Sequence, residues 1–286
     1  MLQLPDGRAV GYAIYGDPEG LPVINCHGGL VSGHDFRPAD RIAQSLGLCV
    51  ISPDRPGIHR TDRLAGHGLL PWVRTDLVPL LNHLEVGSLG VMGWSEGGQY
   101  ALAAAFALAG RVTACAVIAG CPPLDDPVTF KQSNRLDYAL ATLAQKAPMA
   151  VRVTATGTRW LSKHAPRVLL AASVRGLPSA EAEAVKEQGP WFPTILGEGA
   201  ANPHGVVDEY RAAIAPWGFA PENLSTPVCI FQGSVDKMVP EAWGQVLAQR
   251  IPRSSFVSFP NEGHLIALTR REEVLRWLAD TCQRAG

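Results

Sequence analysis

A serine lies at the centre of a glycine-rich pentapeptide, Gly93-Trp94-Ser95-Glu96-Gly97. The apolar run 89–92 before it predicts a strand, and the residues 98–105 after it are typical of a helix. A serine on a sharp strand-to-helix turn projects its hydroxyl from the edge of a sheet, and glycines permit the tight backbone of that turn. We therefore predict that Ser95 is a nucleophile. The alternative is a serine that only caps a helix.

A serine hydroxyl is a poor nucleophile and needs a base and an orienting carboxylate. His264 follows the last predicted strand, 256–259, and Asp236 follows the predicted strand 228–232. Ligands bind at the carboxyl ends of parallel strands, so these side chains are expected to meet Ser95 there. Asp125 and Asp126, after the predicted strand 114–119, are the rival acids. The alternative for His264 is a helix cap or a surface position.

A third group of residues has the composition of an oxyanion hole. The segment Asn25-Cys26-His27-Gly28-Gly29-Leu30 follows an early predicted strand, and its glycines allow backbone N–H groups to approach a substrate oxygen. The residue after the nucleophile, Glu96, would supply a second N–H group. We expect His27 to be structural rather than a second base. The Glu96 carboxylate is either solvated or recognises a cationic substrate group.

Short apolar runs and helical segments alternate along most of the chain. Strands are predicted at 10–15, 23–26, 48–52, 89–93, 114–119, 228–232 and 256–259, and helices at 35–46, 69–84, 96–109, 241–250 and 271–284. Most of the strand runs are apolar throughout, which suits strands covered on both faces. The alternation predicts βαβ units and a mainly parallel sheet with helices on both sides.

The alternation stops near Pro122 and resumes near Thr226. Helices are expected at 135–145 and 179–186, broken by several prolines. About a hundred residues is too long for a bare loop in a compact domain, so the segment predicts an inserted helical lid.

Composition limits the classes of function. The chain has 286 residues, 47% of them hydrophobic and 18% charged, with a formal net charge of -1. It therefore lacks the basic excess of a nucleic-acid-binding protein. The amino terminus has neither the basic nor the apolar region of a secretory signal, and no run of 18 apolar residues occurs, so we expect a cytoplasmic protein that does not enter membranes. The six cysteines show no metal-ligand spacing, so buried thiols and no metal site are expected.

Together and in this order, the motifs resemble those of the α/β-hydrolase fold superfamily over nearly the whole chain. The resemblance is carried by His27-Gly28-Gly29, Asp54-Arg55-Pro56-Gly57, Gly93-Trp94-Ser95-Glu96-Gly97, Gly233-Ser234-Val235-Asp236 and Gly263-His264. It implies a mainly parallel eight-stranded sheet, a core formed by residues 1–122 and 223–286, and a helical cap formed by 123–222. It also implies a catalytic triad and two oxyanion donors. The triad would be Ser95, Asp236 and His264, and the donors Gly29 and Glu96, with Gly28 or Leu30 as substitutes for Gly29.

The motifs also separate branches of this superfamily. Epoxide hydrolases and haloalkane dehalogenases of this fold carry an aspartate at the position of Ser95, which makes those activities unexpected here. Prolyl iminopeptidases typically continue with Pro-Gly after the glycine pair, where this chain has Leu30-Val31.

We therefore expect a cofactor-free serine hydrolase that cleaves a small carboxylic ester or related acyl bond, as a monomer or homodimer. An aminopeptidase or amidase is the main alternative, and a non-catalytic ligand receptor or lyase or perhydrolase chemistry stays open. Expected substrate contacts are Gly28, Leu30, Trp94, Tyr138 and Trp217. The alternative for the aromatic residues is ordinary packing between cap and core.

Overall fold

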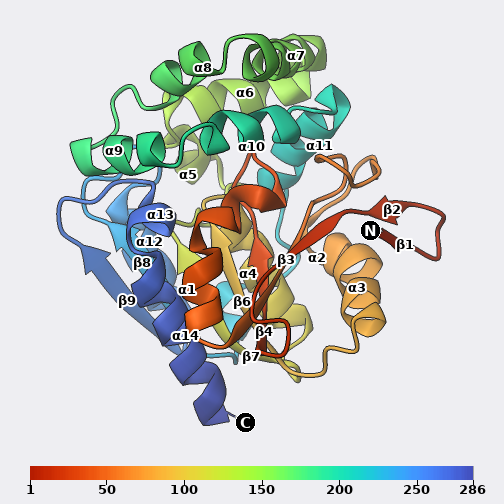
Figure 1. The fold of residues 1–286 in the computed structure, drawn as a ribbon, viewed down its shortest axis with the longest axis vertical. Helices are drawn as coiled ribbons and strands as arrows, with labels where there is room; N and C mark the ends of the chain where they lie inside the picture. The colour runs from red at the N-terminus through yellow and green to blue at the C-terminus, as the bar shows by residue number, and fades with distance from the viewer. Residues whose placement is uncertain (286) are drawn as a thin grey trace.

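Seven strands form one sheet in the order β3-β5-β4-β6-β7-β8-β9 (Figure 1). The computed structural model describes residues 1–285. The strands are β3 (Tyr12–Gly16), β4 (Leu21–Cys26), β5 (Leu48–Pro53), β6 (Leu89–Trp94), β7 (Val112–Ile118), β8 (Val228–Gly233) and β9 (Ser254–Phe259). Only β3 runs antiparallel to its neighbour, β5, and every other pair is parallel.

The mainly parallel sheet is confirmed, but it has seven strands rather than the eight that the resemblance implies. The seven match the apolar runs of the sequence, except that the first run is divided at Gly11. Before it, β2 (Ala9–Val10) pairs with β1 (Leu2–Gln3) in a separate antiparallel hairpin, and after it β3 joins the main sheet. The Gly11 N–H leaves the ladder and donates to Thr61 Oγ1 at 2.9 Å.

Helices cover both faces of the sheet (Figure 1). One face of the sheet packs on α1 (Asp40–Ser45) and α14 (Arg271–Ala285). The other face packs on α4 (Gly97–Ala107), on α12 (Glu241–Arg250) and on three consecutive short helices, α2 (Leu69–Trp72), η2 (Val73–Leu77) and α3 (Val78–His83). Successive residues of the central strands face opposite cores: Val91 of β6 packs with α4, whereas Met92 packs with α14. Both faces are therefore buried, which explains the continuous apolar strand runs.

The segment between β7 and β8 is helical and lies above one end of the sheet (Figure 1). It contains α5 (Pro127–Lys131), α6 (Arg135–Lys146), α7 (Pro148–His164), α8 (Pro166–Ser173), α9 (Ser179–Glu187), α10 (Trp191–Gly199) and α11 (Pro203–Ala213). We call these helices the cap. The short elements η1 (Gly33–Ala39), η3 (Pro221–Asn223) and α13 (Ile266–Thr269) complete the described secondary structure.

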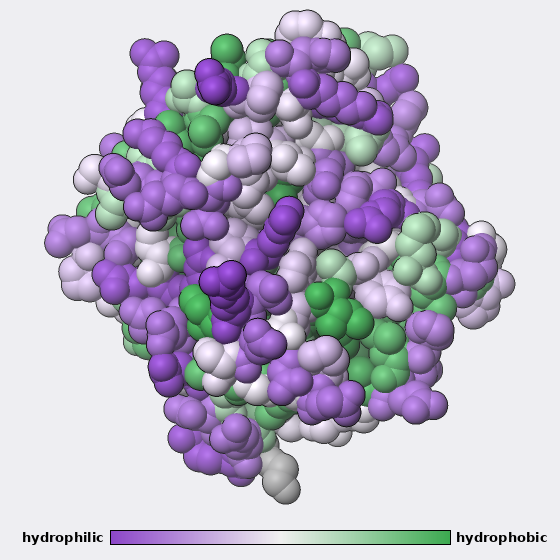
Figure 2. All heavy atoms as spheres, viewed as in Figure 1, coloured by the Kyte–Doolittle hydropathy of each residue, from purple (hydrophilic) through white to green (hydrophobic). Residues whose placement is uncertain are grey.

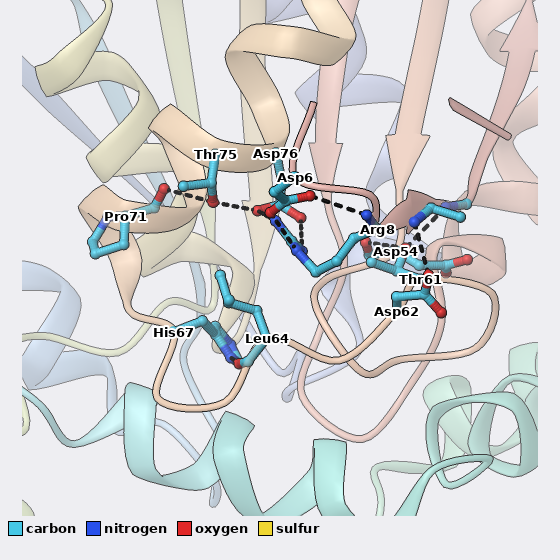
Figure 3. Close-up of polar contacts among 12 residues, drawn as sticks. Asp6, Arg8, Asp54, Thr61, Asp62, Leu64, His67, Pro71, Thr75 and Asp76 are labelled. Atoms are coloured by element: carbon cyan, nitrogen blue, oxygen red, sulfur yellow. Dashed lines mark hydrogen bonds and ion pairs between the residues drawn. The ribbon is translucent and has the colours of Figure 1, made fainter. Parts of the chain in front are cut away.

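Ion pairs fasten the amino-terminal hairpin to the rest of the core (Figure 3). Arg8 donates to the carboxylate of Asp76 in η2 at 2.8 and 3.2 Å, and also to Asp6 at 2.8 Å. Asp76 is almost fully buried. The hairpin is too short to be stable alone, so these contacts hold it in place.

The face of the molecule shown in Figure 2 is mainly hydrophilic, with hydrophobic side chains in small separate groups. Within residues 1–285, no helix is both long enough and apolar enough to cross a membrane.

Candidate active site

Ser95 lies on a tight turn between β6 and α4. Its φ angle is +55°, in the left-handed region that a residue with a side chain rarely adopts. Glycines make the turn possible: a Cβ on Gly93 would overlap the Gly97 carbonyl, and one on Gly97 would overlap the carbonyl of Cys26 in β4. The turn places the hydroxyl at the carboxyl end of β6, beside the start of α4.

A chain of hydrogen bonds joins the three side chains predicted for the triad. Ser95 Oγ lies 3.0 Å from His264 Nε2, and His264 Nδ1 lies 2.9 Å from Asp236 Oδ2. Asp236 Oδ1 accepts the N–H groups of Met238 and Val239 at 2.7 and 3.0 Å, which fixes the carboxylate in place. In this geometry Nδ1 donates to the carboxylate, leaving Nε2 able to accept the serine proton.

Burial and the neighbouring carboxylate act in opposite directions on His264. Burial disfavours the imidazolium, but the charge of Asp236 and its hydrogen bond outweigh burial, so the pKa of His264 is raised above its usual value. The ring also packs 5.6 Å from the Trp94 indole, whose Nε1 donates to the His264 carbonyl at 2.9 Å. Trp94 therefore helps to orient the histidine loop.

The glycine loop after β4 presents one N–H group without a protein partner. The Gly28 N–H donates to Asp35 at 3.1 Å, and the Leu30 N–H donates to Glu209 of α11 at 3.3 Å. The Gly29 N–H between them has no partner within the described part of the chain. This pattern favours Gly29 over Gly28 and Leu30 as the oxyanion donor.

The second expected donor is the N–H of Glu96, immediately before α4. Across residues 1–285 it too has no hydrogen-bond partner, and it lies at the positive end of the helix dipole. Two backbone donors beside a serine hydroxyl have the arrangement that stabilises the oxyanion formed in acyl transfer.

A cavity of about 400 Å³ opens above Ser95, between the sheet and the cap. Gly29, Leu30, Trp94, Ser95, Glu96 and His264 line its floor, and residues of α6, α8, α10 and α11 line its walls. The lining is mainly apolar, with Phe130, Leu136, Ala141, Phe192, Leu196, Ile214 and Met238 among its members. A pocket of this size suits a small organic molecule.

Three of the expected substrate contacts lie outside this pocket lining. Gly28 packs under the Trp94 ring, where a Cβ would clash. Tyr138 is 37% exposed and packs against Phe130, with 4.9 Å between the ring centroids. Trp217 is buried behind the pocket and donates to Gln99 Oε1 at 2.9 Å. Direct substrate contact by these three stays a prediction: each of them packs against or bonds to a residue that lines the cavity, namely Trp94, Phe130 or Gln99.

Two carboxyl groups in the lining have no cationic partner. No cation pairs with Glu96 or Asp137 within residues 1–285, and Glu96 Oε1 is buried without a hydrogen-bond partner. The nearby Arg55 forms an ion pair with Glu209 instead, with 2.7 Å between Arg55 Nη2 and Glu209 Oε1. Burial, reinforced by the charge of Glu209, raises the pKa of Glu96 well above its usual value, although Arg55 opposes the shift.

Sequence reasoning missed a buried carboxylate that the cap contributes beside His264. Glu181 of α9 is fully buried, and its Oε1 accepts the N–H groups of Gly263 and Leu265 at 2.7 and 3.0 Å. These residues flank His264, so the cap holds the histidine loop by its backbone. No local motif marks Glu181, because the contact spans more than 80 residues of sequence.

Comparison with known proteins places this architecture in a family. A family model described as the alpha/beta hydrolase fold matches residues 22–270. The chain belongs to the alpha/beta hydrolase fold family. Membership of this family and an esterase relative support a hydrolase role for this alpha/beta hydrolase.

The relatives of this alpha/beta hydrolase are distant. It is 26% identical to the pimeloyl-(acyl-carrier protein) methyl ester esterase of Chromobacterium violaceum over 269 residues, 92% of this chain and 94% of that protein. It is 31% identical to a non-heme chloroperoxidase of Streptomyces lividans over 121 residues, 42% of this chain and 44% of that protein.

Solved structures share the fold of this hydrolase over almost its full length. An esterase from Thermogutta terrifontis is 20% identical, with a TM-score of 0.71 and coverage of 98% of this chain and 95% of that one. An enol-lactonase from Burkholderia xenovorans LB400 is 16% identical, with a TM-score of 0.73 and coverage of 99% of both chains. At this identity the likeness shows the fold alone.

Proposed function

We propose that this protein is a serine hydrolase that cleaves a small carboxylic ester or related acyl bond. The observation that carries the proposal is the continuous hydrogen-bond chain from Ser95 through His264 to Asp236. It lies at the floor of a mainly apolar cavity, beside two unpartnered backbone N–H groups. The esterase relative that aligns over 92% of the chain supports the choice of an ester.

In the proposed mechanism, His264 Nε2 takes the proton of Ser95 as Oγ attacks the substrate carbonyl. The N–H groups of Gly29 and Glu96 stabilise the oxyanion, each contributing about 3–4 kcal/mol of barrier lowering. As the intermediate collapses, the protonated Nε2 gives its proton to the leaving alcohol and an acyl-enzyme forms. Water, deprotonated by Nε2, then attacks the acyl group, and the acid leaves as Ser95 recovers its proton.

Fluorophosphonate labelling tests this proposal. Stoichiometric label on Ser95, mapped by peptide mass, is expected in the wild type and is lost in Ser95→Ala and strongly slowed in His264→Ala. Ser173→Ala is a matched control, because Ser173 also lines the pocket but donates to the Leu169 carbonyl. Hydrolysis of short 4-nitrophenyl esters should follow the labelling. A folded wild type that neither labels nor turns over any ester of the series would refute the proposal.

A second candidate substrate class is an amine-bearing ester or amide, including a peptide with a free amino terminus. Glu96 and Asp137 favour it, because neither carboxyl group pairs with a cation among residues 1–285. A substrate ammonium would satisfy the buried oxygen of Glu96 and stabilise its ionised form, which burial otherwise disfavours. The test compares kcat/KM for 4-nitrophenyl 6-aminohexanoate with that for the heptanoate, which has a methyl in place of the ammonium. A ratio above one that falls at least tenfold in Asp137→Asn supports this class, and an unchanged ratio excludes it.

A further inference from the structure

Three potential metal ligands meet where the cap contacts the core. His34 belongs to η1, His59 to the loop after β5, and Glu198 to α10 of the cap. One ligand atom from each lies within 4.8 Å of the other two. The residues are 25 and 139 positions apart in sequence, so no ligand spacing reveals them. The expectation of no metal site rested on such spacing.

The distances in this cluster suit a small divalent ion. His34 Nδ1 lies 2.9 Å from Glu198 Oε2, and His59 Nε2 lies 3.7 Å from Glu198 Oε1. Ligand atoms of a tetrahedral zinc ion, each about 2.1 Å from the metal, are about 3.4 Å apart. The side chains are only 17–25% exposed, so an ion could enter and still be largely enclosed.

The backbone of His59 is held in an unfavourable conformation. Its φ angle is +46°, where glycine would be relaxed and a β-carbon costs about 1 kcal/mol or more. Such outliers concentrate at functional sites, because they persist where a side chain is needed at that place. Here the conformation directs the imidazole toward Glu198.

A further carboxylate stands behind His59. Asp54 Oδ2 lies 3.3 Å from His59 Nδ1, while Asp54 Oδ1 accepts the Gly33 N–H at 2.8 Å. Figure 3 shows Asp54 beside Thr61, whose hydroxyl donates to the Asp54 carbonyl and braces the loop. His59 Nδ1 is buried and makes no hydrogen bond among the described residues, and Asp54 is the carboxylate that faces it. A carboxylate that accepts from the far nitrogen is the usual support of a metal-binding imidazole, since it keeps the other nitrogen free for the metal.

We propose that His34, His59 and Glu198 bind a divalent transition-metal ion of the zinc type and so join the cap to the core. Imidazole and carboxylate ligands suit this class of ion, whereas Mg²⁺ prefers oxygen ligands alone. Three protein ligands leave a fourth position for water. The ion would tie α10 to η1, adding to the hydrogen bond from Trp191 Nε1 to the His34 carbonyl at 2.9 Å.

One cation opposes the site. Arg60 Nη2 lies 3.3 Å from His34 Nε2, so that nitrogen is an acceptor and Nδ1 carries the proton in the metal-free protein. Binding at Nδ1 requires the other tautomer and displacement of the Arg60 side chain, which is exposed and free to move. Arg60→Ala is therefore expected to tighten metal binding, a result that an unrelated surface site would not give.

Titration of chelator-treated protein with Zn²⁺ tests the proposal. We expect one ion per chain with micromolar affinity, a rise in Tm of about 5 °C at a hundredfold excess over Kd, and no response to Mg²⁺. Co²⁺ should give visible absorption bands typical of tetrahedral coordination. His34→Gln and Glu198→Gln should each weaken binding at least tenfold. His59→Gly should also weaken binding at least tenfold. Glycine is chosen there because it adopts the positive φ angle of position 59 without strain.

The control is His204→Ala, which removes a histidine that belongs to the cap but not to the cluster. Absence of Zn²⁺ binding in the wild type, binding unchanged in the ligand variants, or binding lost in the control variant would each overturn the proposal. Far-ultraviolet circular dichroism confirms that every variant is folded. The outcome is independent of Ser95 labelling, so failure of this site leaves the proposed function standing.

Discussion

Removing Glu181 should weaken both the fold and the catalytic step. In Glu181→Ala, the buried N–H groups of Gly263 and Leu265 lose their acceptor. Each unsatisfied donor costs about 1–3 kcal/mol, so for the two donors we expect a loss of about 2–6 kcal/mol in the free energy of unfolding. Because these donors flank His264, the imidazole should also leave its position against Ser95. We expect kcat to fall about 10- to 100-fold with little change in KM.

The assay measures kcat and KM on a short 4-nitrophenyl ester, the rate of fluorophosphonate labelling, and Tm. Glu183→Ala is the matched control, since Glu183 lies on the same helix but is exposed. Glu181→Gln keeps one acceptor oxygen and should recover most of the labelling rate. If Glu181→Ala and Glu183→Ala labelled at the same rate, the cap carboxylate would not position the histidine loop, and the reasoning would be refuted.

Three further variants test separate parts of the structure. In Asp236→Asn, kcat should fall about 10³- to 10⁴-fold. Burial then lowers the pKa of His264 without the opposing charge of Asp236, so the acid limb of the pH profile of kcat/KM should move to lower pH. An acid limb that does not move would contradict this. In Leu196→Ala, the pocket should join a neighbouring apolar cavity of about 150 Å³ in the cap, because Leu196 lines both. The larger space should raise kcat/KM for the octanoate ester relative to the butyrate ester. Val168→Ala is the control and should leave this ratio unchanged, since Val168 is exposed. In Arg55→Ala, Glu209 is left buried without its cation, so the free energy of unfolding should fall by about 3–5 kcal/mol, measured by thermal unfolding. The double variant Arg55→Ala/Glu209→Gln should recover part of this loss.

The sheet and its strand-end residues were predictable because their signals are local. The inner parallel strands β5, β6 and β8 are buried on both faces and so leave nearly continuous apolar runs, whereas the edge strand β9 (Ser254–Phe259) is only partly buried. Ser95, Asp236 and His264 each follow a strand within a few residues. The topology of a parallel sheet then brings strand ends to one edge, so three separate local patterns indicate one site.

The cap was harder to predict because its prolines were interpreted as breaks. In the structure, Pro148, Pro166 and Pro203 each occupy the first turn of a helix, where the missing N–H costs nothing. Helices α7, α8, α10 and α11 were therefore not expected. The contacts of Glu198 could not be found without α10. Glu181 lies on the predicted helix 179–186, but its contact depends on where the cap lies over the sheet, which no local pattern records.

Side-chain chemistry alone also failed to separate the pocket wall from the layer behind it. Tyr138 and Trp217 have the apolar surface expected of a substrate contact, yet each packs against a residue that lines the cavity. A sequence pattern shows where an aromatic residue falls in a helix or loop, but not whether its side chain lines a cavity, lies behind the lining as Trp217 does, or is partly exposed as Tyr138 is.

The position of the cap between β7 and β8 has a consequence for synthesis of the chain. Cys115 of β7 pairs with Val228 of β8, so the central sheet closes a loop of about 110 residues, at an entropic cost of about 4 kcal/mol. A chain emerging from the ribosome presents Ser95 and the entire cap before β8 exists. At about 5–20 residues per second, the roughly 110 residues between β7 and β8 take about 6–22 s, during which the edge of β7 is unpaired. Ser95 is thus translated well before Asp236 and His264, so the hydrogen-bond chain that joins the three side chains forms only after β8 and β9 have docked.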